Sequence, residues 1–409
     1  MTLKDYEQIF HDTAFIRTSG SPEELKAAHY LQDRLQKMGV SSTLEAFPVE
    51  MAEIEEAELI CDGVSIPCTG YKLAGNAEIE APLYYLTHDD PCSLAACKGK
   101  IVLSERPFGH WFYQDVFQAG AVGFITYSGN VNFPDNDIDP KELRGFVADG
   151  NILPGVHIHT RSAIELVAKN AKTAKIVLKQ KTWPGESHNI VVELPGESEE
   201  TVVFSAHYDS VPLSVGTWDN MSGCVGILAM CEYYLTHPHL RTLRFVWCGS
   251  EESGLLGSKA YVQQHEAELG KYRMNINLDM IGSIMGVPTV GVAAEPRLAS
   301  YLEYLACEYG RPLRVSQGPY PSDSTPFADK NVPAMTWARD PLPIAATLHN
   351  RYDTIQEMTM EHVQEDIDFI LYFADRMVNA KVFPVSKEIP EKLRGELDEY
   401  MNRKRPEKK

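Results

Sequence analysis

Histidines and carboxylates occur in five short segments of the chain, each at or just after the end of an expected strand. The segments are AHYD (206–209), TWDNMSG (217–223), GSEESG (249–254), NLDMIG (277–282) and LHNRYDT (348–354). In open α/β sheets, ligands bind at the carboxyl ends of the strands, so the five segments can converge on a single cleft. Imidazole nitrogens and carboxylate oxygens are common metal ligands, and the segments together predict a metal site.

Each segment also has a simpler structural interpretation. His207 and Asp209 share one face of a strand, where Asp209 either holds His207 as a neutral ligand or makes only a structural hydrogen bond. Asp219 opens a helix and could be no more than its cap. The neighbouring Glu251 and Glu252 point in different directions, so one could bind metal and the other transfer a proton, although a glutamate pair also favours a helix start.

The number of ligands is sufficient for two metal ions. Two histidines and three carboxylates make two nitrogen- and oxygen-rich sites if one carboxylate is shared, which suits a pair of zinc ions. Such pairs lie about 3.5–4 Å apart and clamp a hydrolytic water. Cobalt or manganese would accept the same ligands. The pattern therefore indicates metal-assisted hydrolysis.

Strands and helices alternate in the region that must position these residues. Beyond about residue 186, strands are expected at 202–206, 243–247, 276–278 and 334–337, and helices at 222–236, 254–265 and 297–309. This alternation predicts an α/β fold with a mainly parallel central sheet and helices on both faces.

The rest of the chain has different sequence patterns, which predict other elements. Ser21-Pro22-Glu23-Glu24 predicts a capping box and an amphipathic helix that ends near Gly39. Residues 41–182 contain short apolar runs split by glycine and proline, which predicts a β-rich module. Within it, His157 and His159 share one strand face and are expected to be structural. The segment 387–409 is highly charged, so we expect a solvated helix with a frayed tail.

Composition excludes several classes of protein. The chain has 409 residues, which suggests two domains, and 57 acidic against 38 basic residues give a formal charge of −19. This charge repels nucleic acid and anionic lipid, so we expect neither as a partner. No apolar run approaches membrane-spanning length and no signal peptide pattern occurs, so we expect a cytoplasmic protein. The eight cysteines form no CxxC pair and are expected to be free thiols.

Taken together and in this order, the motifs resemble the M28 family of co-catalytic zinc peptidases, which includes many aminopeptidases. They are SAHYDS (205–210), WDNMSG (218–223), RFVWCGSEESGLLGSKAYV (244–262), NLDMIG (277–282), SDSTPF (322–327) and LHNRYDT (348–354). The resemblance implies that Asp219 bridges two zinc ions. Glu252 and His349 would complete one zinc site, and His207 and Asp279 the other.

The resemblance also implies roles around the metals. Glu251 would be the general base and acid, and Asp209 would orient His207. Tyr320 lies near the position where relatives place a tyrosine that donates a hydrogen bond to the tetrahedral oxyanion. A cis peptide bond between Asp219 and Asn220 is a further expectation.

The β-rich module is similar to a protease-associated domain, through CKGKIVLSE (97–105) and AGAVGFITYSG (119–129). In related enzymes such a domain is inserted into the peptidase domain and covers the cleft or restricts substrates. We therefore expect a discontinuous catalytic domain at 1–45 and 183–385, an inserted domain at 46–182, and a charged tail at 386–409.

The leading expectation is an aminopeptidase that acts on peptides, with two alternatives. Arg351 could pair with a substrate carboxylate, as in a dipeptidase or carboxypeptidase, or with Asp353 or another nearby acid. Related folds also include a glutaminyl cyclase with one zinc and non-catalytic receptor ectodomains, but these usually depart from the full ligand set. Ser324 and Asn350-Arg351 differ from the residues that many members carry at these positions, so specificity cannot be transferred.

Overall fold

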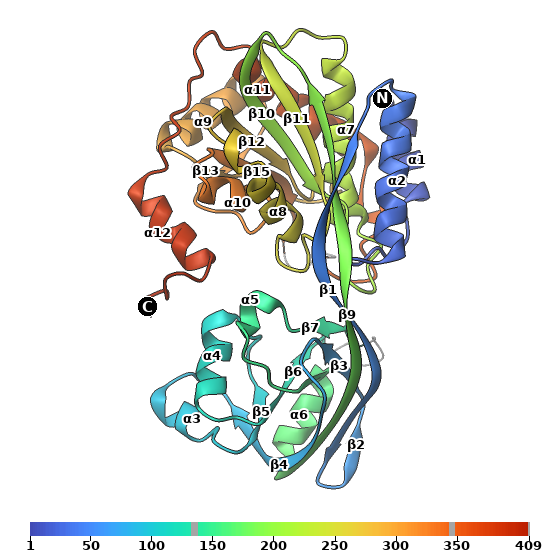
Figure 1. The fold of residues 1–409 in the computed structure, drawn as a ribbon, viewed down its shortest axis with the longest axis vertical. Coiled ribbons are helices and arrows are strands. Elements are labelled where there is room, and N and C mark those ends of the chain that lie inside the picture. The colour runs from blue at the N-terminus through green and yellow to red at the C-terminus, as the bar shows by residue number, and fades with distance from the viewer. Residues whose placement is uncertain (132–137, 343–347, 408–409) are drawn as a thin grey trace. The chain divides into compact units, whose positions relative to one another are not determined.

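The computed structural model describes residues 1–131, 138–342 and 348–407 (Figure 1). The chain divides into two compact units. Unit 1 contains Met1–Val49 and Glu186–Lys409, and unit 2 contains Glu50–Gly185. Two long strands, β1 (Thr43–Cys61) and β9 (Thr173–Leu194), contribute residues to both units.

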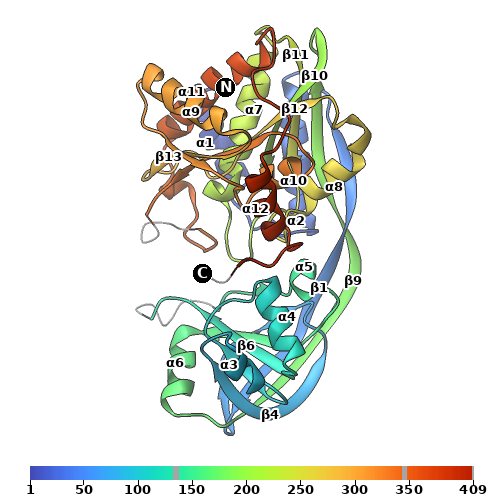
Figure 2. The same cartoon turned by 90° about the vertical axis from the view of Figure 1, so that its left-hand side faces the viewer.

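Unit 1 is built on a mixed sheet in the order β14-β13-β15-β12-β10-β11-β9 (Figures 1 and 2). Its other strands are β10 (Ser198–His207), β11 (Arg241–Cys248), β12 (Tyr272–Leu278), β13 (Val287–Ala293), β14 (Arg314–Gln317) and β15 (Ala334–Asp340). The central strands β11, β10, β12 and β15 run parallel to one another, whereas β9 and β13 pair antiparallel with β11 and β15. The predicted α/β class with a mainly parallel sheet is confirmed.

Helices cover both faces of this sheet because its central strands are apolar on both sides. Along β10, Val202 and Phe204 belong to one core cluster and Val203 to another, as the alternation of side chains along a strand requires. The first cluster includes α1 (Leu3–Asp12), α2 (Pro22–Lys37), α7 (Ser222–Tyr234), α9 (Pro296–Tyr309) and α11 (Met360–Val378). The second includes α8 (Leu256–Gln264), α10 (Ser324–Asp329) and α12 (Glu391–Tyr400).

The segment after residue 386 contains α12, whose Leu393 and Leu397 are buried in the second cluster. The described part of this segment, up to residue 407, is therefore grouped with unit 1. The many charges of this segment conceal its two inward-facing leucines, which recur at helical spacing.

Unit 2 has its own core between helices and a sheet in the order β9-β4-β5-β6-β8-β3-β7. Its strands are β2 (Val64–Ile66), β3 (Cys68–Lys72), β4 (Ala77–Leu86), β5 (Ile101–Ser104), β6 (Gly123–Ser128), β7 (Lys141–Glu142) and β8 (Gly155–His159). Its helices are α3 (Pro91–Ala95), α4 (His110–Gln118), α5 (Gly145–Ala148) and α6 (Thr160–Ala168).

The two histidines of β8 are buried in unit 2. The ring nitrogens of His157 lie 2.7 Å from Thr126 Oγ1 and 2.8 Å from Ser128 Oγ, and burial lowers the pKa of His157 to about 4. A neutral ring between two hydroxyl groups supports the structural interpretation of this residue.

All eight cysteines are free thiols. Among the helices of the described residues, none combines the length and apolar character needed to cross a membrane.

Candidate metal centre

Several of the predicted residues lie together at the carboxyl ends of three neighbouring strands. His207 is the last residue of β10, and Asp279 directly follows β12. Glu251 and Glu252 lie in the turn after β11. Because β10 is hydrogen-bonded to both β11 and β12 in parallel, these side chains meet at the same edge of the sheet.

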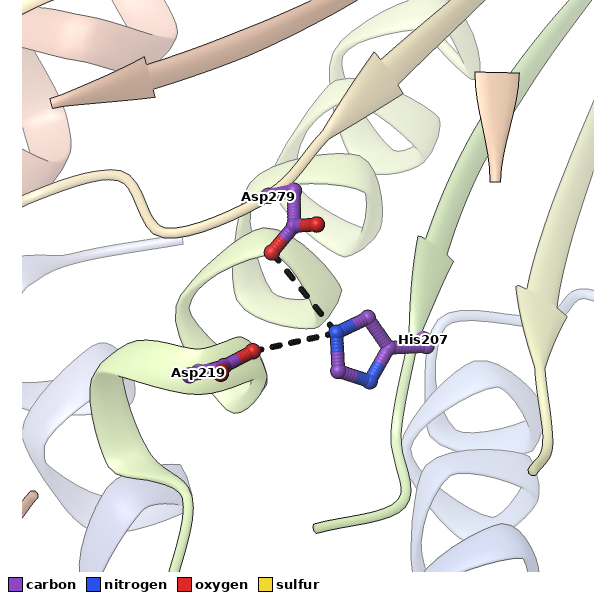
Figure 3. Close-up of side chains that lie close together, drawn as sticks. All are labelled: His207, Asp219 and Asp279. Atoms are coloured by element: carbon purple, nitrogen blue, oxygen red, sulfur yellow. Dashed lines mark ion pairs between the residues drawn. The ribbon is translucent and has the colours of Figure 1, made fainter. Parts of the chain in front are cut away.

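A first cluster forms around His207. Its Nε2 lies 3.1 Å from Asp219 Oδ1 and 3.6 Å from Asp279 Oδ1. Figure 3 shows this ring nitrogen directed at both carboxylates. All three residues are buried. Asp219 belongs to η1 (Thr217–Met221), the irregular turn before α7, and its peptide bond to Asn220 is cis, as expected.

A second cluster shares Asp219 with the first. Nε2 of His349 lies 3.1 Å from Asp219 Oδ2 and 3.2 Å from Glu252 Oε2. The two oxygens of Asp219 therefore face two different histidines, one from each cluster. The His349 side chain is 48% exposed, so this cluster is open to solvent on one side. The ligand atoms of each cluster lie within 4.8 Å of one another.

Glu251 and Asp209 complete the arrangement. Glu251 Oε2 lies 4.0 Å from His207 Nε2, and its side chain is 11% exposed. Asp209 is fully buried, with Oδ1 at 3.3 Å from His207 Nδ1. Its two oxygens also accept the main-chain N–H groups of Glu251 and Glu252, at 2.9 and 3.1 Å. Asp209 thus holds the turn that carries the two glutamates and lies beside the ring of His207.

The electrostatics of the clusters suit a cation. Burial raises the pKa of Glu251 well above its usual range, although the nearby His207 opposes this shift. Burial and the charge of Asp219 raise the pKa of Glu252 as well. Among the described residues, Asp279 Oδ1 and Glu252 Oε1 are buried without a hydrogen-bond partner. Carboxylates gathered without enough donors are costly unless a positive charge joins them, so the residues present fit divalent metal ions.

Several contacts around the clusters involve residues for which no role was predicted. The side chain of Asn220 donates to Leu278 O and accepts from Gly223 N and Met280 N, which ties the Asp219 turn to the Asp279 loop. Ser322 donates its hydroxyl to Asp279 Oδ2. Its place in the SDSTPF motif was the one sequence signal for this contact.

Two buried acids were also missed. Asp323 is fully buried, and burial, opposed by the charge of His207, raises its pKa to about 7. Asp353, also fully buried, accepts the main-chain N–H groups of Trp218 and Asp219 at 2.7 and 3.0 Å. Asp353 was predicted only as a possible partner of Arg351. Its contact with η1 joins segments that are far apart in the chain, and no local sequence pattern indicates such a contact.

Replacing Asp353 by alanine should lower the free energy of unfolding by about 2–6 kcal/mol. Two buried N–H groups would lose their acceptors, and each unsatisfied group costs about 1–3 kcal/mol. Urea unfolding of the metal-free protein measures the change without a contribution from metal binding. Asp353→Asn keeps one acceptor oxygen and should lose about half as much. A loss below about 0.5 kcal/mol in the alanine variant would contradict this role.

Tyr320 lies near the candidate metal centre, since the charges of Asp279 and Asp219 act on its hydroxyl group. Its side chain is partly buried and hydrogen-bonds with Asp340, at the end of β15. Burial, followed by the charge of Asp279, raises its pKa above the usual range, so the hydroxyl keeps its proton. Arg351 is exposed, two positions after His349.

Comparisons with known proteins agree with this arrangement. Residues 189–374 match the model of Peptidase family M28. The matched range contains His207, Asp219, the two glutamates, Asp279 and His349. Residues 46–182 lie outside it, and the assignment of this range as a protease-associated domain stays a prediction.

Relatives that match more than half of this chain include leucine aminopeptidases. Leucine aminopeptidase 2 of Arthroderma otae is 31% identical over 258 residues, which are 58% of this chain and 50% of that protein. The chain thus spans about half the length of the curated relatives it matches.

Solved structures share the fold over nearly the whole chain. A zinc aminopeptidase from Bacillus subtilis has a TM-score of 0.77 at 24% sequence identity. The matched region covers 96% of this chain and 98% of the Bacillus subtilis chain. An aminopeptidase from Aneurinibacillus sp. strain AM-1 also has a TM-score of 0.77, at 21% identity, and covers 94% of this chain and 96% of its own.

Proposed function

We propose that this protein is a zinc-dependent aminopeptidase that removes residues from the amino terminus of peptides. The observation that carries the proposal is the position of Asp219, whose two oxygens each lie 3.1 Å from a different histidine. His207, Asp219 and Asp279 would hold one zinc ion, and Asp219, Glu252 and His349 a second. The match to a peptidase family and the named relatives support the reaction class.

The metals and the protein have separate tasks in the proposed reaction. Zinc bound at such sites lowers the pKa of water and polarises a carbonyl group. Glu251 accepts the proton of the attacking water and then passes it to the leaving amine. Burial raises the pKa of this carboxyl group above its usual range, and a carboxylate with a raised pKa is a stronger base.

Other side chains orient the reacting groups. Asp209 keeps the backbone of the two glutamates in place, and its Oδ1, at 3.3 Å from His207 Nδ1, would orient this ring when zinc is bound. The carboxylates at the site would attract the ammonium group of a free amino terminus, which favours an aminopeptidase over an endopeptidase. Tyr320 keeps its proton and is a donor for a developing oxyanion if its hydroxyl turns away from Asp340.

Zinc binding to these residues should release protons at neutral pH. Burial lowers the pKa of His349, but hydrogen bonds with Asp219 and Glu252 outweigh burial and raise it to about 11. His349 is therefore protonated at pH 7 without metal, whereas zinc needs a neutral imidazole. Zinc affinity should consequently increase with pH. Titration calorimetry at pH 7 in buffers of different protonation enthalpy should show at least one proton released per chain. An equal heat in all buffers would contradict this expectation.

The direct test of the function is mass spectrometry of one peptide in three forms: free, N-acetylated and C-amidated. An aminopeptidase should shorten the free and amidated forms from the front, one residue at a time, and leave the acetylated form intact. Cleavage of the acetylated form but not of the amidated form would overturn the proposal. It would indicate that Arg351 recognises a substrate carboxylate, as in a carboxypeptidase.

A further inference from the structure

Two buried ionisable residues contact the loops of the candidate metal centre from outside: Arg17 lies between α1 and α2, and Glu24 lies in the first turn of α2. Arg17 is 0% exposed and Glu24 is 2% exposed. Both precede the residues that match the peptidase family. Burying such groups is costly unless they are well hydrogen-bonded, so the identity of their partners indicates what they hold in place.

Arg17 holds the loop between His207 and Asp219. Its guanidinium donates to the main-chain carbonyls of Tyr208, Val215 and Gly216, and on its own segment to those of Thr13 and Phe15. The chain packs closely here: Gly216 has a φ of 54°, and a Cβ at this position would lie 2.4 Å from Asp219 O. Arg17 therefore fixes the path of the chain that separates the two ligands.

Glu24 holds the turn that carries the two glutamates. Its Oε1 accepts the main-chain N–H of Ser250 at 2.8 Å and the Ser250 hydroxyl at 3.0 Å. Its Oε2 accepts the N–H of Gly20 at 2.7 Å. Ser250 has a φ of 54°, a conformation that is unfavourable for a side-chain-bearing residue without such support.

The turn is thus held from two sides. Glu24 binds it at Ser250, and Asp209 binds the next two N–H groups, those of Glu251 and Glu252. Asp209 also lies next to His207 Nδ1. A change in the position of Ser250 would therefore move both glutamates relative to His207.

We propose that Arg17 and Glu24 are positioning residues of the metal centre, which hold the Asp219 loop and the Glu251–Glu252 turn in the geometry that binds zinc. The inference rests on the proposed function, but it concerns residues that belong to neither of the two ligand clusters. It predicts that their removal weakens zinc binding itself and does not only lower the stability of the fold.

The test is the zinc affinity of purified full-length variants, measured by competition with a chromophoric chelator. Glu24→Ala should bind zinc about 10- to 100-fold more weakly, as expected when a group that orients metal ligands is lost. Its kcat should fall, while KM changes less. Glu23→Ala is the matched control, because Glu23 is exposed on the same turn of α2. It should behave as the wild type.

Conservative variants separate positioning from folding. Glu24→Gln keeps an acceptor for Ser250 and should recover most of the zinc affinity. Arg17→Lys keeps the positive charge but has too few hydrogen-bond donors for the carbonyls that Arg17 contacts, so this variant should bind zinc weakly. Wild-type zinc affinity and kcat in Glu24→Ala would overturn the proposal. If Glu24→Ala does not fold, wild-type affinity in Arg17→Lys would overturn it instead. A wild-type protein that binds zinc but cleaves no peptide would overturn the proposed function alone.

Discussion

Replacing Glu251 by glutamine should lower kcat by about 10²- to 10⁴-fold, the usual contribution of a general acid and base. Glutamine has nearly the same shape but cannot take up a proton. Glu251 is not one of the three residues of either metal cluster, and its Oε2 lies 4.0 Å from His207 Nε2. The variant should therefore retain its zinc while losing turnover.

Steady-state kinetics on the free peptide, together with metal analysis of the same sample, measure both parts of this prediction. Glu197→Gln serves as a control, since Glu197 is an exposed glutamate at a distant position in the sequence. Near wild-type turnover in Glu251→Gln would exclude the proposed role. If zinc were lost together with activity, Glu251 would instead be a metal ligand.

Replacing Asp219 by asparagine should weaken both zinc sites together. Each oxygen of Asp219 faces a different histidine, and the amide nitrogen of asparagine cannot replace a carboxylate oxygen as a ligand. Activity should fall by at least ~1000-fold, because several kcal/mol of transition-state stabilisation depend on the metals. The fold should remain, since the two side chains have nearly the same size.

Zinc content per chain after dialysis distinguishes this shared ligand from the others. His349→Ala is the matched comparison and should weaken one site only, because His349 contacts Asp219 and Glu252 but belongs to a single cluster. If Asp219→Asn kept as much zinc as His349→Ala, Asp219 would not be shared between two ions.

The residues that meet at the sheet edge were predictable because each follows an element with a clear local signal. Apolar runs mark β10, β11 and β12, and the rule that parallel strands bring their carboxyl ends together places His207, Glu252 and Asp279 in one region. The α/β class depends on the same signals. Distances within the site could not be predicted in this way, since they depend on how the loops pack.

Contacts between distant segments were missed for the same reason. Ser21 caps α2 as predicted, but the capping box is wrong: Glu24 does not turn back to Ser21 and binds Ser250 instead. Asp353 similarly reaches the N–H of Asp219, more than a hundred residues away. A carboxylate can accept hydrogen bonds from donors that are near or far along the chain, and tertiary packing decides which donors it contacts.

The most direct test of a two-metal site is anomalous diffraction at the zinc edge from crystals of zinc-loaded protein. We expect two peaks about 3.5–4 Å apart. One should lie next to His207, Asp219 and Asp279, and the other next to Asp219, Glu252 and His349. A single peak, or peaks away from Asp219, would contradict the account.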